Sequence, residues 1–382
     1  MSGYGGHGGH GGHGGHGGHG GHGGHGGHGG HGGHGAAVLA DGYANALDAA
    51  ALTLSREAII DPLHSAGGVP GAMNSGSPVN MLRWEPWVRR NIIQQSLMEN
   101  LRFDVTGLRA AAAPPSASLY QGAHALVKLS MPTPADFASQ VSLVLRWAEL
   151  REERSSEILT QMVEPFAFLN SIVYLHPERT RHTIELLTYV FNFAIAVDMR
   201  FKHEFACWRP SEYSPMIQPM ITTPGHGTYP SGHATEIFAA VAVLSELLAT
   251  GPATTQQLQR VAARVATNRV IAGVHFPVDS VAGRLLGHQL AQYFVSAAAG
   301  TQWTGREFDC TAFFARTDGP LDLRLVDQVP SAVGASLFYK DIQLGAPAAP
   351  VTTVAPLCRP LQEMWNLARA EWIINGTGKV FA

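Results

Sequence analysis

The sequence is poor in cysteine, in charge and in long apolar runs, and each shortage excludes a class of protein. Its 382 residues contain three cysteines, an odd number placed far apart at Cys207, Cys310 and Cys358. They suggest neither a disulfide framework nor a metal site built from cysteine pairs. Only 14% of the residues are charged, and the formal net charge is −3 at pH 7. This balance gives no reason to expect binding to nucleic acid or to an anionic membrane surface.

Apolar runs are too short for a membrane protein. No stretch reaches the roughly 18 uninterrupted apolar residues of a membrane span. The N-terminus also lacks the basic and apolar regions of a secretory signal. The two most apolar segments, Leu186–Ala196 and Ile237–Ala249, are better interpreted as core helices. We therefore expect a cytoplasmic protein with no membrane span.

The N-terminus is a low-complexity segment. The tripeptide Gly-Gly-His repeats ten times between Gly5 and His34, and these repeats hold ten of the 19 histidines. Such a composition cannot build a core, so residues 1–35 are predicted to be a disordered tail. Its imidazoles could bind nickel, copper or zinc at several loose sites, or the tail could be a solubilising extension.

The rest of the chain, residues 36–382, shows helical periodicity and little strand-like alternation. We predict an all-α fold: a single helical domain with irregular N- and C-terminal segments. The charged run 149–157 is expected to be the solvated continuation of a helix that begins at Pro134. Further helices are expected at 36–60, 87–101, 158–174, 177–197, 255–271, 277–298 and 360–372, and directly after Gly232.

Three short motifs gather residues suited to binding an anion. The first, KHEFACWRP, places Lys202 and Arg209 seven residues apart. If the helix continues, both cations point to the same side, about 10 Å apart. Pro210 would end this helix at Arg209. Taken alone, the pair is more typical of ordinary surface cations at a helix end.

The second motif, TYPSGHAT, precedes a long apolar segment. A helix N-terminus exposes unpaired N–H groups and the positive end of the helix dipole, which favour an anion. Gly232 allows close approach, Ser231 supplies a hydroxyl group, and His233 supplies a proton that moves near neutral pH. A simple N-cap role for Ser231 explains this tetrapeptide equally well.

The third motif is RVIAGVHFPVD. Arg269 lies near the end of one helix, Gly273 can break that helix, and Pro277 can start the next. His275 therefore lies at a junction, and Asp279 can accept the hydrogen bond of its second ring N–H group, which makes the free nitrogen more basic. A purely structural histidine is the alternative for this motif alone.

Together the motifs bring three cations, two imidazoles and neutral donors into a core of low charge, which favours a shared anionic partner. The order Lys-x6-Arg-Pro, Pro-Ser-Gly-His and Arg-x5-His-x3-Asp resembles the superfamily that unites vanadium-dependent haloperoxidases, type-2 phosphatidic acid phosphatases and bacterial non-specific acid phosphatases. The resemblance spans roughly residues 191–298, and every motif position is filled. It implies a helical bundle of the haloperoxidase/acid phosphatase type, with the anion-binding core at about 178–298.

The resemblance also implies a role for each motif residue. His275 would bond the central atom, as a nucleophile on phosphorus or as the ligand of vanadium, and Asp279 would orient it. His233 would be the general acid/base, and Lys202 would help to polarise bound peroxide in a peroxidase. Vanadate, or phosphate in competition with it, would be bound by Lys202, Arg209, Ser231, Gly232, His233, Arg269 and His275.

Two activities follow from the resemblance. One is a vanadium-dependent haloperoxidase, whose partners are halide, hydrogen peroxide and a small organic substrate. The other is an acid phosphatase that hydrolyses phosphate monoesters through a phosphohistidine. His226, a further catalytic candidate, stands where algal bromoperoxidases have histidine, and Met199 stands where fungal chloroperoxidases have tryptophan, so the likeness favours bromide. Compact motif spacing favours a phosphatase or a small bacterial peroxidase. A metal-storage protein and a homo-oligomer stay open.

Overall fold

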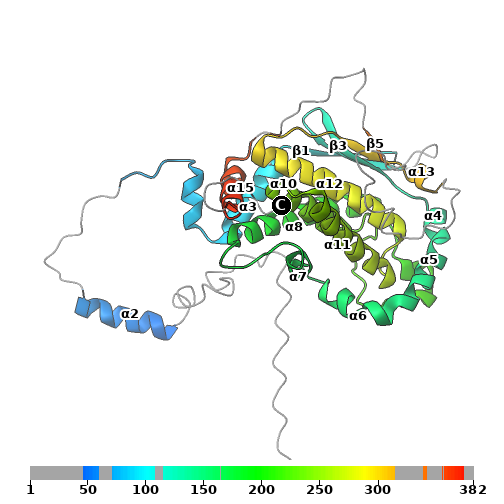
Figure 1. Cartoon of the computed structure of the whole chain (residues 1–382), viewed down its shortest axis with the longest axis horizontal. Coiled ribbons are helices and arrows are strands. Elements are labelled where there is room, and N and C mark those ends of the chain that lie inside the picture. Colours follow the sequence, from blue (N-terminus) through cyan, green and yellow to red (C-terminus); the bar gives the residue numbers. More distant parts are fainter. Residues whose placement is uncertain are drawn as a thin grey trace, which may run out of the picture. The chain divides into compact units, whose positions relative to one another are not determined.

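The computed structural model of the chain describes residues 46–59, 71–107, 115–163, 165–314, 339–341, 355 and 357–373 (Figure 1). The Gly-Gly-His tail, with its predicted disorder and metal binding, lies outside these residues. The chain divides into two units, Met1–Met73 and Asn74–Ala382, each described by itself. In the first unit, helix α2 (Ala46–Ile59) lies within the helix predicted over 36–60.

Four helices form the centre of the second unit: α8 (Arg181–Phe205), α10 (Gly232–Leu248), α11 (Pro252–Ile271) and α12 (Pro277–Ala299). They lie side by side in Figure 1, and α10 packs against each of the other three. The two segments predicted as core helices, in α8 and α10, are largely buried among apolar side chains. α10 buries residues on nearly every face, as a helix surrounded by protein must.

Two glycines bring α12 unusually close to α10. A Cβ atom at Gly287 would lie 2.4 Å from the Thr235 carbonyl oxygen, and one at Gly283 would lie 2.5 Å from the Ser231 carbonyl oxygen. No side chain fits at these distances, so glycine is required at both positions. The close approach also lets the Ser231 N–H group donate to the Asp279 carbonyl oxygen at 2.9 Å. The start of α10 is thereby attached to the start of α12.

A five-stranded sheet corrects the prediction of an all-α fold. β3 and β4 pair in parallel, and the other neighbours in the order β1-β2-β3-β4-β5 pair antiparallel. Apolar and polar residues alternate strictly in β1, whose sequence is LRFDVT, and this is a strand pattern that the all-α prediction overlooks. β3 and β4 pack against α12. The strands are β1 (Leu101–Thr106), β2 (Ser116–Gln121), β3 (His124–Ser130), β4 (Arg306–Phe308) and β5 (Tyr339–Asp341).

Several helix predictions are wrong in their boundaries. The helix expected to continue from Pro134 into the run 149–157 ends at Ser139, and separate short helices follow it. The helix expected over 177–197 begins at Arg181. The helix expected over 158–174 is not continuous. α6 (Arg151–Thr160) covers only its first residues, and the short α7 (Phe166–Asn170) lies in the rest of this range.

The motif spacing predicts Lys202 and Arg209 on one helix, but α8 ends at Phe205, where Ala206 adopts a left-handed conformation with φ 46°. Arg209 therefore lies at the start of α9 (Pro210–Tyr213).

The shorter helices surround this centre. α4 begins at Pro134, as predicted, and Thr133 and Asp136 form a capping box at this end. The last helix, α15, packs against α8 and α12. Within the described ranges, no helix is both long and apolar enough to cross a bilayer. The shorter helices of these ranges are η1 (Pro78–Arg83), α3 (Pro86–Glu99), α4 (Pro134–Ser139), α5 (Val141–Trp147), η2 (Ala148–Leu150), η3 (Pro215–Ile217), α13 (Cys310–Phe314) and α15 (Arg359–Ala370).

Replacement of Gly287 by alanine is expected to lower the free energy of unfolding by about 1–3 kcal/mol, the usual cost of overpacking a core. The added methyl group would overlap the Thr235 carbonyl oxygen, and backbone cannot rotate away. Urea unfolding followed by circular dichroism measures the change. Gly225→Ala is the matched control, because nothing lies within 4 Å of its added Cβ atom. Equal unfolding midpoints for Gly287→Ala and wild type would contradict the close helix contact.

Candidate active site

The three motifs converge where the ends of four helices meet. Lys202 lies in the last turn of α8, and Arg269 lies in the last turn of α11. Ser231 caps the N-terminus of α10, and His275 lies in the junction between α11 and α12. Each of the following side chains is at most 4% exposed: Lys202, Arg209, Ser231, Arg269, His275 and Asp279.

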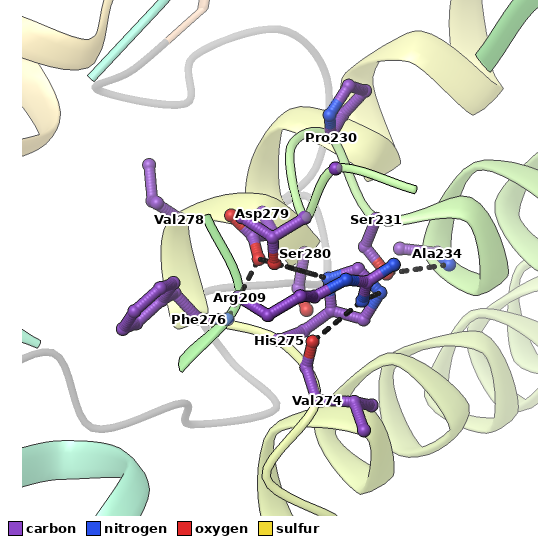
Figure 2. A network of polar contacts seen from close by, with 12 residues as sticks. Arg209, Pro230, Ser231, Ala234, Val274, His275, Phe276, Val278, Asp279 and Ser280 are labelled. Carbon is purple, nitrogen blue, oxygen red and sulfur yellow. Dashed lines mark hydrogen bonds and ion pairs between the residues drawn. The ribbon is translucent and has the colours of Figure 1, made fainter. Parts of the chain in front are cut away.

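His275 and Asp279 form the hydrogen bond that their spacing predicts (Figure 2). The His275 Nδ1 atom lies 3.0 Å from Asp279 Oδ2. The same oxygen accepts from the Thr228 hydroxyl group at 2.5 Å and from the Phe276 N–H group at 2.8 Å. Since Nδ1 donates its proton to this carboxylate, the Nε2 atom carries the lone pair. Burial, followed by the charge of Arg209, holds the pKa of His275 well below its usual value, so the ring is neutral.

Arg209 donates a hydrogen bond to the second ring nitrogen of His275, as Figure 2 shows. Its Nη1 atom donates to the Val274 carbonyl oxygen at 2.7 Å and to His275 Nε2 at 3.1 Å, so an atom that bonds Nε2 would have to replace this second hydrogen bond. Its Nε atom donates to the His226 carbonyl oxygen at 3.1 Å, and its Nη2 atom lies 3.0 Å from His226 Nδ1. Arg209 therefore ties the loop before α10 to the α11–α12 junction. Its position marks where an anion bonded to Nε2 would meet a guanidinium group.

Lys202 holds the loop that leads into α10. Its ammonium group donates to the carbonyl oxygens of Gly227 at 3.2 Å and Thr228 at 3.1 Å, and to that of Pro230. Asp198, one turn earlier on α8, places its carboxylate 3.7 Å from the same nitrogen. Burial lowers the pKa of Lys202 and raises that of Asp198 to about 6. Because an ammonium group has three protons, an anion would have to replace one of the loop carbonyls.

The start of α10 has the predicted cap. The Ser231 hydroxyl oxygen accepts from the Ala234 N–H group at 3.4 Å, so the N-cap interpretation is confirmed. Donation from Ser231 and Gly232 to an anion stays a prediction. A Cβ atom at Gly232 would lie 3.2 Å from Asp198 Oδ2 and 3.8 Å from Lys202 Cε. Glycine at this position therefore lets the Asp198–Lys202 pair lie against the helix N-terminus.

The two other histidines of the candidate site, His233 and His226, differ in exposure. His233, in the first turn of α10, lies with its Nε2 atom 3.0 Å from the Gln161 carbonyl oxygen. A carbonyl oxygen only accepts, so Nε2 carries the proton and Nδ1 is left as the acceptor. Burial, and next the charge of Arg269, lower the pKa of His233 to about 3. His226 is exposed at one edge, yet its partial burial and the charge of Lys202 lower its pKa to about 4.

Arg269 uses only part of its guanidinium group for hydrogen bonds to the described residues. Its Nη2 atom donates to the Ile158 carbonyl oxygen at 2.9 Å and lies 3.4 Å from Gln161 Oε1. Its Nε and Nη1 atoms are buried and have no hydrogen-bond partner among the described residues. Unpaired buried donors cost free energy, and an anion with several oxygens would satisfy them. Among the described residues, no group of three or more His, Cys, Asp or Glu side chains could hold a metal cation.

Sequence reasoning missed three residues that hold these side chains. Asp198 had a local signal, because an acid four residues before a lysine on a helix lies on the same face. Thr228 stands inside the second motif, but nothing in its spacing predicts the hydrogen bond to Asp279. Gln161 lies at the end of α6, far from every motif in the sequence, and carries no local signal.

Residues 183–302 match the family model of the PAP2 superfamily. The match covers all three motifs and confirms, for that segment, the superfamily that the motifs predict. Among solved structures, the chain is similar to the crystal structure of a transmembrane PAP2 type phosphatidylglycerolphosphate phosphatase from Bacillus subtilis. The identity is 17%, over 41% of this chain and 92% of that chain, with a TM-score of 0.26. The chain matches none of the curated proteins with which it was compared.

Replacement of Asp198 by asparagine is expected to raise the free energy of unfolding at pH 7.5. Burial raises the pKa of this carboxyl group from 3.8 to about 6, so between these values the folded state binds more protons than the unfolded state. The contribution of Asp198 to stability is complete at low pH and is lost as the pH rises through about 6. Asparagine imitates the protonated form at every pH. The gain should be about 1–3 kcal/mol at pH 7.5 and close to zero near pH 4.

Urea unfolding of both proteins at the two pH values measures this gain. A loss of stability at pH 7.5 would contradict the prediction, because it would mean that the ion pair with Lys202 outweighs the burial of the carboxylate.

Proposed function

We propose that the second unit binds an oxyanion through His275 and acts as a vanadium-dependent haloperoxidase, similar to bromoperoxidases. The observation that carries the proposal is the buried His275–Asp279 pair, which leaves the Nε2 lone pair next to Arg209. The unpaired Nε and Nη1 atoms of Arg269 support it, because a tetrahedral oxyanion offers acceptors to such donors. The match of residues 183–302 to the PAP2 superfamily supports the same kind of site.

Vanadate fits these residues as a cofactor, because it is an oxyanion that needs donors for its oxygens and one basic nitrogen for its central atom. Bound there, it would supply the activation of hydrogen peroxide for halide oxidation. Arg209, Arg269 and Lys202 would hold its oxygens, together with Ser231 and the Gly232 N–H group. His275 would hold vanadium through Nε2, while Asp279 keeps the Nδ1 proton in place.

His233 would move the proton that the reaction needs. Its Nε2 proton is held on the Gln161 carbonyl oxygen, so Nδ1 is the atom that would accept a proton and return it. Its pKa of about 3 would leave it unprotonated near neutral pH. A bound oxyanion would oppose this shift, because a nearby negative charge favours the imidazolium form. Lys202 would add positive charge at the reacting oxygen.

Phosphate ester hydrolysis at the same residues is the second candidate, and the PAP2 superfamily match favours it. His275 Nε2 would attack phosphorus, the bond from phosphorus to the ester oxygen would break, and His233 would give its proton to the departing alcohol. Water would then release phosphate from the phosphohistidine. The buried cations serve both reactions, because phosphoryl transfer depends mostly on positioning and charge stabilisation around a five-coordinate centre.

His275→Ala is expected to abolish vanadate binding, halide oxidation and any phosphate ester hydrolysis, because we propose that its Nε2 atom bonds the central atom. Asp279→Ala should lower activity by about one to two orders of magnitude, as the loss of an orienting partner usually does. The assays are bromide, iodide and chloride oxidation by peroxide after incubation with orthovanadate, and hydrolysis of a chromogenic phosphate ester without vanadate. Wild-type activity in a folded His275→Ala protein would refute the site.

The same assays separate the two functions. The haloperoxidase proposal expects bromide and iodide oxidation, with little chloride oxidation. If vanadate-loaded protein oxidises no halide while vanadate-free protein hydrolyses the ester, the phosphatase proposal replaces it.

His226→Ala is expected to lower bromide turnover and to move its pH optimum, while vanadate still binds. The side chain accepts a hydrogen bond from Arg209 Nη2 at 3.0 Å, and its loss would leave Arg209 less firmly placed. The backbone carbonyl of residue 226, which Arg209 Nε also contacts, is unaffected by the substitution. His226→Gln is the matched control, because its side chain keeps an acceptor but cannot titrate. A shifted pH optimum in both variants would assign the effect to titration, and unchanged turnover in both would refute a role for His226.

A further inference from the structure

Gln161 contacts two side chains of the oxyanion site from outside all three motifs. It caps the C-terminus of α6 and is 1% exposed. Its backbone carbonyl oxygen lies 3.0 Å from His233 Nε2, and its side-chain Oε1 atom lies 3.4 Å from Arg269 Nη2. One residue therefore touches both the imidazole at the start of α10 and the guanidinium group at the end of α11.

The side chain of Gln161 is fixed by a further hydrogen bond, from Asn268 of α11. Its Oε1 atom accepts a hydrogen bond from Asn268 Nδ2 at 2.9 Å, and the same nitrogen lies 3.2 Å from Glu157 Oε2. Glu157 also accepts two hydrogen bonds from Arg264, at 2.7 and 2.5 Å. The charged run 149–157, which the sequence analysis places in solvent, thus contributes a carboxylate that packs α6 against α11. A network held at several points leaves the amide of Gln161 little freedom to rotate.

The neutrality of Gln161 matters for the charge of the site. An amide oxygen accepts a hydrogen bond from Arg269 but does not neutralise the guanidinium group. A carboxylate at the same position would pair with Arg269 and compete with an incoming anion. Burial lowers the pKa of Arg269 to about 10, against the electrostatic effect of Glu236 of α10, which raises it.

We propose that Gln161 is a positioning residue of the oxyanion site: its side chain fixes Arg269 without neutralising it, and its carbonyl group fixes the tautomer of His233. The inference rests on the proposed function, because it presumes that Arg269 and His233 serve a bound oxyanion. It adds α6 to the elements that build the site, although no motif marks this helix.

Two substitutions separate the contact from the charge. Gln161→Met keeps the size of the side chain and removes the acceptor, and it should weaken binding of inorganic phosphate and orthovanadate about threefold to tenfold, the effect of one lost hydrogen bond. Gln161→Glu should weaken both about tenfold to a hundredfold, because the new carboxylate binds Arg269 and repels the anion. The melting temperature of Gln161→Glu without anion should equal or exceed that of wild type, since the new carboxylate would lie next to the buried guanidinium group of Arg269.

The measurements are isothermal titration calorimetry with each anion at pH 8 and thermal unfolding with and without anion, all on the full chain. Gln121→Met is the matched control, because Gln121 is a buried glutamine that accepts one hydrogen bond, from Trp303 at 3.0 Å. It should lose stability but keep its anion affinity.

Three results would count against the inference. Wild-type affinities in both Gln161 variants would overturn it while leaving the proposed function intact. If both variants lost thermal stability without anion and anion affinity to a similar degree, the role of Gln161 would be purely structural. A structural role would lower both quantities together, whereas the inference expects Gln161→Glu to lose affinity without losing stability. Failure of the wild-type protein to bind either anion would overturn the proposed function, and the inference with it.

Discussion

The burial of three cations in a weakly charged core is the constraint on which the rest of the site depends. Lys202, Arg209 and Arg269 are each at most 3% exposed, and buried charge is tolerated only where hydrogen bonds or opposite charges replace water. Backbone carbonyl groups provide most of these hydrogen bonds. Carbonyl groups of the loop before α10 accept from Lys202, and Arg209 donates to one carbonyl group of this loop and to one of the α11–α12 junction. Ile158 at the end of α6 does the same for Arg269. The conformation of each loop is therefore tied to a charge.

Asp279 joins this charge arrangement to the helix framework. One of its carboxylate oxygens accepts from the His275 ring, the Thr228 hydroxyl group and the N–H group of Phe276, the residue that precedes α12. Its carbonyl oxygen accepts from Ser231, which is possible because Gly283 lets α12 approach the start of α10. The same residue thus caps a helix, attaches a second helix and orients the imidazole. Burial raises its pKa to about 6, so these roles carry an electrostatic cost that its hydrogen bonds only partly offset.

What could be predicted from the sequence is what local spacing determines. The Ser231 cap and the His275–Asp279 hydrogen bond each depend on residues within four positions of one another, and both are present. The end of α8 could not be predicted, because Ala206 takes a left-handed conformation that alanine rarely adopts. The sheet could have been predicted in part, because residues 101–106 of β1 (LRFDVT) alternate between apolar and polar, whereas the apolar run in β3 is too short to distinguish a strand from a helix. The contact of Gln161 with Arg269 could not be predicted either. It links α6 to α11 over more than a hundred positions, and local periodicity carries no information about such distant pairs.

The protonation of His275 and His233 would let the proposed oxyanion site hold both a base and an acid. His275 and His233 are each neutral, and each has its N–H group committed, to Asp279 and to the Gln161 carbonyl oxygen respectively. Each ring therefore keeps one lone pair, and burial among cations prevents either from being protonated near neutral pH. An oxyanion bonded at His275 would offset the charge of the cations that lower the pKa of His233. The imidazolium acid would then form only once the anion that needs its proton is bound, which couples acid catalysis to substrate binding.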